Sequence, residues 1–203
     1  MKQMKNKEIR MLDVELRASD EDEKMIVEGY AITFNQPATH GYTEIISEKA
    51  LDNTDMSDVP LKYNHEDSHL IMARTRNKSL ELKKDDKGLF IRAELIDTQS
   101  NKDIYKSIKA GLIDKMSFAF TTRGDEYDYD TDTRTITDIE KLFDVSVVDL
   151  PFYDSTSVYA RGENDDFLAR REELRKEHEE KLAEEQRKAQ LEEAKRKLIE
   201  KLG

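Results

Sequence analysis

Two of the four histidines of the chain, His65 and His69, lie four residues apart in 61-LKYNHEDSHL-70, and Glu66 directly follows the first. This is the pattern His-Glu-x-x-His, which on a helix places two imidazoles on one face to bind zinc, with the glutamate as general base. The residues before it read as a strand, however, and no helical apolar periodicity surrounds it. No third ligand is evident. A metal-dependent hydrolase therefore stays a minor alternative.

His65 can also serve as the general base for a serine nucleophile. Ser117, in 114-DKMSFAF-120, starts a predicted strand directly after a predicted helix, so its backbone is fixed and its hydroxyl accessible. Asp144 interrupts the apolar segment 142-LFDVSVV-148, where an ionised carboxylate needs a partner. An imidazolium suits it, because the acid orients the ring and stabilises its charge. The chain order His, Ser, acid differs from the familiar triad orders, and spacing alone leaves the triad open.

Composition limits the classes of protein to which the chain can belong. Of its 203 residues, 36% are hydrophobic and 39% charged, so some part must be a solvated element outside the core. The net charge of −11 argues against binding to nucleic acid or to an anionic membrane surface. The absence of cysteine excludes disulfides, zinc–thiolate sites and thiol catalysis. With no secretory signal and no long apolar run, we expect a soluble, intracellular protein.

Strands dominate the predicted structure up to residue 162. Alternating apolar and polar residues predict half-buried strands at 8–18 and 25–34. The segments 79–84 and 88–95 alternate likewise, and the turn-forming residues 85–88 between them predict a hairpin. Further strand segments are predicted at 115–123, 134–141, 142–150 and 156–161.

One helix is clearly predicted over residues 101–114, with Asn101 as its N-cap and Gly111 marking its end. A second, shorter helix is expected around residues 47–54. Many short strands with few helices indicate a mainly β (α+β) fold, a small closed or partly open β-barrel or compact sandwich with surrounding helices. The apolar face expected of the first helix comprises Ile104, Ile108 and Leu112.

The composition changes sharply near Gly162, which divides the chain into a domain of residues 1–162 and a tail of residues 163–203. More than half of the tail is charged, and glutamates precede lysines or arginines by four residues, as in Glu184 and Lys188. Asn164 or Asp165 could cap its start. The leucines keep no strict heptad. A long solvated helix is therefore expected, with a weak coiled coil or a partner-docking helix as the alternative.

Four segments together resemble the prohead (procapsid) maturation proteases of tailed phages. They are 28-EGYAITFN-35, 63-YNHE-66, 104-IYKSIKAGLIDKMSFAF-120 and 142-LFDVSVVDLPFYDSTSV-158. The combination is more specific than any single segment. The resemblance implies a fold similar to that of the herpesvirus assembly proteases, a small β-barrel with surrounding helices.

The resemblance also implies roles for the candidate residues. His65 matches the catalytic histidine, Ser117 the nucleophile, and Asp144 the acidic position, where the family more often shows glutamate. Herpesvirus relatives use a second histidine there, so His69 is an alternative third member. The chain departs from the family pattern at Ala73, where glycine is usual, and at Pro151-Phe152-Tyr153, which replaces Pro-Ala-Asn. Both departures lie near the edges of the implied site, where the substrate groove is expected.

The implied function is that of a serine endopeptidase that cleaves major capsid protein, scaffold segments and itself inside the assembling prohead, in the host cytoplasm. No cofactor, nucleic acid or membrane is expected to take part, and a homo-oligomer, a dimer, is expected. The charged tail would target the enzyme to the shell or pair its subunits. The alternatives are a non-enzymatic scaffold or capsid-assembly protein and the metal-dependent hydrolase.

Overall fold

The computed structural model describes residues 7–12, 16–21, 24–39, 41–67, 71–149 and 165–202. They belong to two compact units, residues 1–163 and 164–203, and each unit is described by itself. The elements of the first unit are β1 (Glu8–Leu12), β2 (Leu16–Glu21), β3 (Lys24–Thr33), β4 (Ala38–Thr39), β5 (Thr43–Ile46), η1 (Glu48–Leu51), β6 (Pro60–Tyr63), β7 (Ala73–Arg74), η2 (Thr75–Asn77), β8 (Leu80–Lys84), β9 (Gly88–Leu95), α1 (Gln99–Lys109), β10 (Lys115–Asp128) and β11 (Thr133–Val148). The second unit consists of α2 (Asp165–Leu202). Within the described ranges, no helix is long and apolar enough to cross a membrane.

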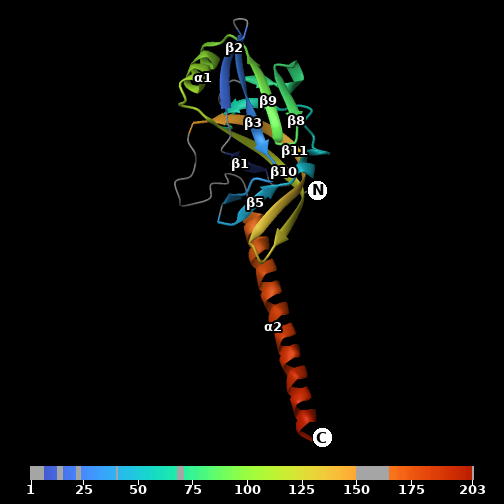
Figure 1. The fold of residues 1–203 in the computed structure, drawn as a ribbon. Helices are drawn as coiled ribbons and strands as arrows, with labels where there is room; N and C mark the ends of the chain where they lie inside the picture. The colour runs from blue at the N-terminus through green and yellow to red at the C-terminus, as the bar shows by residue number, and fades with distance from the viewer. Residues whose placement is uncertain are drawn as a thin grey trace. The chain divides into compact units, whose positions relative to one another are not determined.

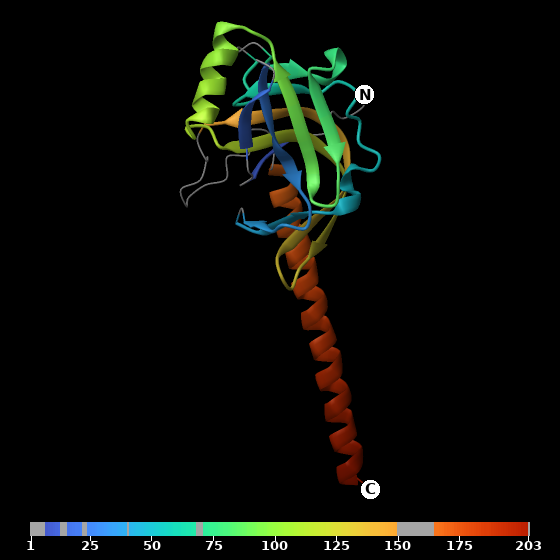
Figure 2. The same ribbon diagram turned by 45° about the horizontal axis from the view of Figure 1, so that its top comes forward.

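The strands of the first unit form two sheets. One has the order β2-β3-β9-β8 and is antiparallel, and α1 lies beside its β2 edge (Figure 1). The other has the order β1-β10-β11-β5-β4, with β6 and β7 added to β11. Figure 2 shows the four-stranded sheet in front of the long β10 and β11 strands. The mainly β, α+β prediction is confirmed, but the barrel is not, because the described strands form two sheets and close no barrel.

Among the residues that the structure describes, one buried apolar cluster contains side chains from both sheets. Alternation along β3 and β9 buries Val27 and Ile91 from the first sheet, as the period-two pattern predicts. From the second sheet, β10 buries Phe118 and Phe120, whose rings stack with centroids 5.1 Å apart. This core fixes β10 and β11, which carry two of the three candidate site residues.

The strand predictions differ from the structure in several places. The single strand predicted over residues 8–18 is two strands, β1 and β2, which belong to different sheets. The segments 134–141 and 142–150 are not separate, because β11 runs through both and pairs with β10 across several register shifts. The hairpin predicted for residues 79–95 is confirmed as β8 and β9. The side chain of Asp85 closes its turn by accepting hydrogen bonds from two backbone N–H groups of the loop. The predicted strand 156–161 lies outside the described residues.

The first helix begins two residues earlier than predicted. Thr98, not Asn101, caps α1, and its hydroxyl oxygen accepts a hydrogen bond from the Asn101 backbone N–H at 3.3 Å. The Asn101 side chain is buried and instead donates to the carbonyl oxygen of Ile96 at 3.0 Å. Gly111, with φ of +71°, lies just after the helix end as expected, so Leu112 falls beyond the helix and is 71% exposed.

The helix expected around residues 47–54 is only the short 3₁₀ turn η1. Ser47 caps this turn, since its hydroxyl oxygen accepts from the Lys49 backbone N–H. The turn buries Ala50 and Leu51. Residues 52 and 53 form a turn, and Asp55, just beyond the predicted helix, makes a bridge to Lys141 on β11.

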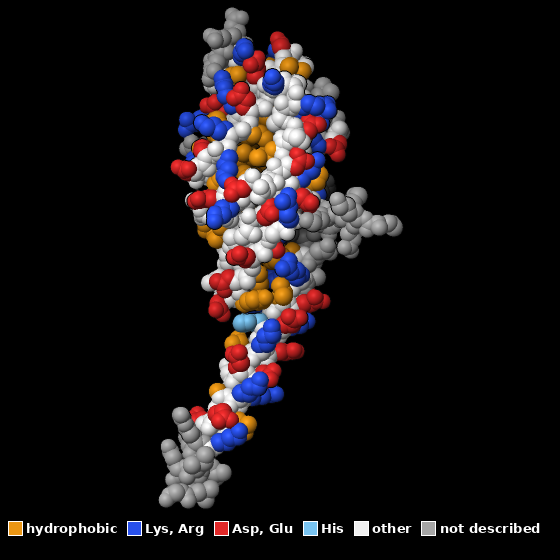
Figure 3. All heavy atoms as spheres, turned by 90° about the vertical axis from the view of Figure 1, so that its right-hand side faces the viewer, with side chains coloured by type: hydrophobic (Ala, Val, Ile, Leu, Met, Phe, Trp, Pro, Cys, Tyr) orange, Lys and Arg blue, Asp and Glu red, His pale blue; other side chains and the backbone are white. Residues whose placement is uncertain are grey.

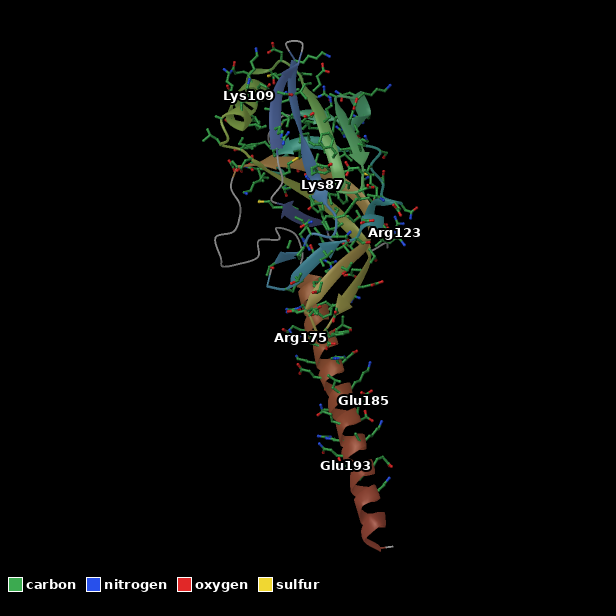
Figure 4. The ribbon with its side chains drawn as sticks, viewed as in Figure 1. Lys87, Lys109, Arg123, Arg175, Glu185 and Glu193 are labelled. Carbon is green, nitrogen blue, oxygen red and sulfur yellow. The ribbon has the colours of Figure 1, made fainter. Side chains whose placement is uncertain are left out.

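The long helix predicted for the tail is confirmed as α2, which has 38 residues. Figure 3 shows acidic and basic side chains interspersed along it, and Figure 4 shows Arg175, Glu185 and Glu193 projecting from it. Leu182 and Leu191 are exposed, in keeping with a solvated helix. The coiled coil stays a prediction. Of the two proposed caps, Asn164 lies outside the described residues and Asp165 is the first helical residue.

Candidate active site

Strand pairing brings the three candidate residues into one place. Ser117 on β10 is the register partner of Ser146 on β11, and Asp144 lies two residues before Ser146 on the same face of that strand. Strand β6 runs parallel to β11, with Lys62 opposite Ser146. The chain therefore leaves β6 beside this part of the sheet, and His65 follows two residues after its end.

A left-handed turn directs His65 toward the sheet. Asn64 and His65 have φ angles of +51° and +57°, a conformation uncommon for residues other than glycine. The Asn64 backbone N–H donates to the carbonyl oxygen of Val147 at 3.0 Å, and its side-chain amide donates to Asp149 at 3.0 Å. Two residues held in this region are strained and need such support, which is common at functional sites.

The imidazole of His65 joins the other two candidates. Its Nε2 lies 2.5 Å from the Ser117 hydroxyl oxygen, and its Nδ1 is hydrogen-bonded to a carboxylate oxygen of Asp144. A neutral imidazole that donates from Nδ1 to Asp144 leaves Nε2 as an acceptor for the serine proton. This is the arrangement in which a serine oxygen can be activated as a nucleophile.

The carboxyl group of Asp144 is fully buried, with 0% of the residue exposed. Burial alone raises its pKa, but the hydrogen bond and charge interaction with His65, assisted by the Lys7 ammonium, hold the pKa below its usual value. Lys7 Nζ lies 3.1 Å from the second carboxylate oxygen. Asp144 is therefore ionised at neutral pH and can orient His65.

Ser117 is covered by the N-terminal strand β1. Met11 is its register partner on β1, and only 1% of the residue is exposed, so the prediction of an accessible hydroxyl is wrong. The Ser117 hydroxyl donates to the carbonyl oxygen of Arg10 at 2.8 Å. The single serine proton therefore has two acceptors within reach, this carbonyl oxygen and Nε2 of His65.

Buried ion pairs attach β1 to the rest of the unit. The guanidinium of Arg10 pairs with Glu8 at 2.7 Å and with Glu44 of β5. Arg134 of β11 pairs with the same two carboxylates, at 2.6 and 3.0 Å, and with Asp125 at 2.8 Å. A buried charge that loses its partner destabilises a fold strongly, so this network fixes β1 beside Ser117.

The His-Glu-x-x-His pattern does not take the helical form that a zinc site of this kind requires. His65 lies in a left-handed turn, and both of its ring nitrogens already have partners. Glu66 and Asp67 are exposed, as expected for loop charges, and Asp67 pairs with Lys62 at 2.5 Å. His69 lies outside the described residues, and the described residues hold no group of three side chains suited to a metal.

Sequence reasoning missed three groups that touch the site, the side chains of Lys7 and Ser146 and the carbonyl oxygen of Arg10. Ser146 could have been found, because it is polar in an apolar strand and shares the face of Asp144. Nothing in the residue types around Lys7 and Arg10 indicates that they contact the site. Their contacts depend on the pairing of β1 with β10, which joins residues more than 100 positions apart.

Hydrolases with a serine nucleophile use this arrangement, in which a serine hydroxyl contacts an imidazole and the imidazole contacts a buried carboxylate. The chain matches the family model of the caudovirus prohead serine proteases over residues 12–168, most of its length. It therefore belongs to this family, and the resemblance inferred from the sequence is confirmed.

The prohead protease of Enterobacteria phage HK97 is similar in sequence, with 26% identity over 152 residues that cover 73% of this chain. The match spans 65% of that relative's own length. Among solved structures, the bacteriophage T4 capsid assembly protease aligns with a TM-score of 0.43 and 11% identity, over 70% of this chain and 98% of the T4 chain.

Proposed function

We propose that the chain is a serine endopeptidase in which Ser117 is the nucleophile, His65 the general base and Asp144 the acid that orients it. The observation that carries this proposal is the position of His65, whose two ring nitrogens contact Ser117 and Asp144. Membership of a serine protease family supports the same assignment.

The reaction proceeds by acyl transfer. The Ser117 oxygen forms a bond to the carbonyl carbon of the substrate peptide while its proton passes to Nε2 of His65. The carbon–nitrogen bond then breaks as His65 gives this proton to the departing amine. Water attacks the resulting ester, again with His65 as the base, and releases Ser117. The negative charge of Asp144 stabilises the imidazolium that forms in both steps.

The proposed substrates are the major capsid protein, scaffold segments and the protease itself, cleaved inside the assembling prohead in the host. The similar HK97 protein is named a prohead protease, which supports this class of substrate. The net charge of −11 agrees with a protein substrate rather than a nucleic acid. A homodimer is the proposed active oligomer.

The proposed protease domain consists of residues 1–162. Residues 163–203 would target the enzyme to the shell or pair its subunits. Support for the tail's separate role comes from α2, which is charged along its length and has exposed leucines. Such a helix can act as a spacer or docking element without belonging to a protease core.

Co-expression with the cognate major capsid protein tests the proposed function. The intact mass of the capsid protein is compared for wild type, Ser117→Ala and Ser107→Ala. Ser107 is the matched control because it lies in α1, where its hydroxyl bonds only within the helix, to the Asp103 carbonyl oxygen. The proposal predicts a defined truncation with wild type and Ser107→Ala and none with Ser117→Ala. No truncation by wild type, with shells assembling normally, would favour a scaffold or assembly protein.

A further inference from the structure

Ser146 lies at the centre of the site but takes part in neither bond that defines the triad. It is 0% exposed, and the strand period places it on the face of β11 that also presents Asp144. It is also the register partner of Ser117 on β10. A buried hydroxyl at this position must satisfy its own hydrogen bonds within the site.

The hydroxyl of Ser146 contacts His65 at two points and Asp144 at one. Its oxygen accepts from the His65 backbone N–H at 3.2 Å and lies 3.2 Å from Nδ1 of the same residue. Its hydroxyl donates a hydrogen bond to a carboxylate oxygen of Asp144 at 3.1 Å. The same carboxylate oxygen is bonded to Nδ1 of His65. The hydroxyl thus donates to Asp144 and accepts from the His65 backbone, while the Nδ1 contact is a close approach beside the bond that Nδ1 makes to Asp144.

These contacts support the backbone conformation of His65 and the orientation of the Asp144 carboxylate. His65 is in the left-handed region, which most residues avoid, and the bond to its backbone N–H supports that conformation. The bond to Asp144 fixes the carboxylate rotamer that receives Nδ1. The hydroxyl therefore connects the backbone of His65 to the side chain of Asp144, and both residues belong to the candidate triad.

We propose that Ser146 is a positioning residue that holds His65 and Asp144 in the geometry needed to activate Ser117. This inference rests on the proposed function. Ser146 does not touch the substrate and exchanges no proton with it. Its effect is on the reaction step, because misplacing a reacting group by about 1 Å can lower a rate by about 100-fold.

Three variants of Ser146 separate hydrogen bonding from packing. Ser146→Ala removes all three contacts, Ser146→Cys keeps the approximate volume with much weaker bonds, and Ser146→Thr keeps the hydroxyl. Val145→Ala is the matched control, since Val145 is equally buried on the same strand but belongs to the apolar core. It lowers stability without removing a bond of the site.

We expect kcat for capsid-protein cleavage to fall about 10- to 100-fold in Ser146→Ala and Ser146→Cys, with KM within about twofold of wild type. Ser146→Thr should recover most of kcat, and Val145→Ala should leave it nearly unchanged. In ¹H NMR spectra, the low-field signal of the proton between His65 and Asp144 should shift or vanish in Ser146→Ala but not in Val145→Ala.

Two results would overturn the inference while leaving the proposed function intact. One is a kcat of Ser146→Ala equal to wild type in a protein that Ser117→Ala inactivates. The other is an equal fall in Ser146→Ala and Val145→Ala, with the low-field signal unchanged, which would make the role of Ser146 one of packing. Cleavage that survives Ser117→Ala would instead refute the proposed function itself. The NMR signal reports on the Ser146 contacts even when no cleavage is measured.

Discussion

The hydroxyl of Ser117 donates a hydrogen bond to the carbonyl oxygen of Arg10, at 2.8 Å, although the two residues are 107 positions apart in the chain. Strand β1 brings them together, and it leaves only 1% of Ser117 exposed. Access to Ser117 therefore depends on how firmly β1 is held.

The first prediction concerns this access. Ile9→Pro places a ring with a fixed φ in the middle of β1, which disfavours the extended backbone that pairs with β10. We expect a fluorophosphonate reagent to label Ser117 several-fold faster in this variant than in wild type. Ile9→Val is the control and should react like wild type. An equal or slower rate in Ile9→Pro, with the protein still folded, would show that β1 does not limit access.

The second prediction concerns stability in acid. Pairing with Arg10 and Arg134 outweighs burial and holds the pKa of both Glu8 and Glu44 below its usual value. A lowered pKa in the folded state means that the stabilisation is complete above the unfolded pKa, about 4.3, and is lost as the pH falls through the folded pKa. The melting temperature should therefore decline steeply below about pH 4.

Glu44→Gln tests the source of this decline. At pH 7 the variant should lose roughly 3–5 kcal/mol of unfolding free energy, because Arg10 keeps a buried charge with one partner fewer. Its melting temperature should also depend less on pH in acid. Glu94→Gln is the control, since Glu94 pairs with Lys24 on the surface at 3.0 Å. Identical pH curves for wild type and Glu44→Gln would exclude the buried network as the source.

The third prediction concerns Lys7, whose ammonium group helps to keep the pKa of Asp144 low. Lys7→Gln should raise that pKa, so Asp144 should take up its proton at a higher pH than in wild type. The side-chain carboxyl ¹³C resonance of Asp144, followed against pH, measures this directly. Lys62→Gln is the control, because Lys62 pairs with Asp67. An unchanged titration midpoint in Lys7→Gln would contradict the role given to Lys7.

The fourth prediction concerns Asp144 itself. Asp144→Asn removes the negative charge that fixes the tautomer of His65, so kcat should fall by about 10⁴-fold while the protein stays folded. Asp58→Asn provides the comparison, since Asp58 is ionised and paired with Arg74 but is only partly buried. Its kcat should match wild type. A loss below about tenfold in Asp144→Asn would point to a different third residue, such as His69.

The fifth prediction concerns the tail. Deletion of the chain after Gly162 should leave peptide cleavage intact and should change either the oligomeric state or incorporation into proheads. Light scattering and the protein content of purified proheads measure the two effects. If neither changed, the tail would have neither of the proposed roles.

The three residues that meet in the candidate site could be singled out from the sequence because their chemistry is visible locally. Asp144 is a charge in an apolar strand, Ser117 starts a strand after a helix, and His65 follows a strand end. Their meeting at one place depends on β10 pairing with β11 and on the parallel pairing of β6 with β11. The residues of one strand do not determine which strand it pairs with. The resemblance to a known family is therefore needed to bring the three residues together.

The contacts missed from sequence are long-range. Arg134 pairs with Glu8 across 126 positions, and the left-handed turn at His65 contains no glycine to indicate it. The cap of α1 was misplaced because Thr98 and Asn101 are both good capping residues, and tertiary burial of Asn101 decided between them. The Asn101 side chain instead donates to the carbonyl oxygen of Ile96, a contact that the capping pattern alone does not indicate.

The most direct test of the central claim is to identify the residue that reacts. A preparation that has cleaved capsid protein is treated with a fluorophosphonate reagent, and the modified peptide is sequenced by mass spectrometry. The account predicts a single adduct on Ser117 that forms in wild type and is lost in His65→Ala. An adduct on another serine, or capsid cleavage that continues after Ser117 is fully modified, would contradict it.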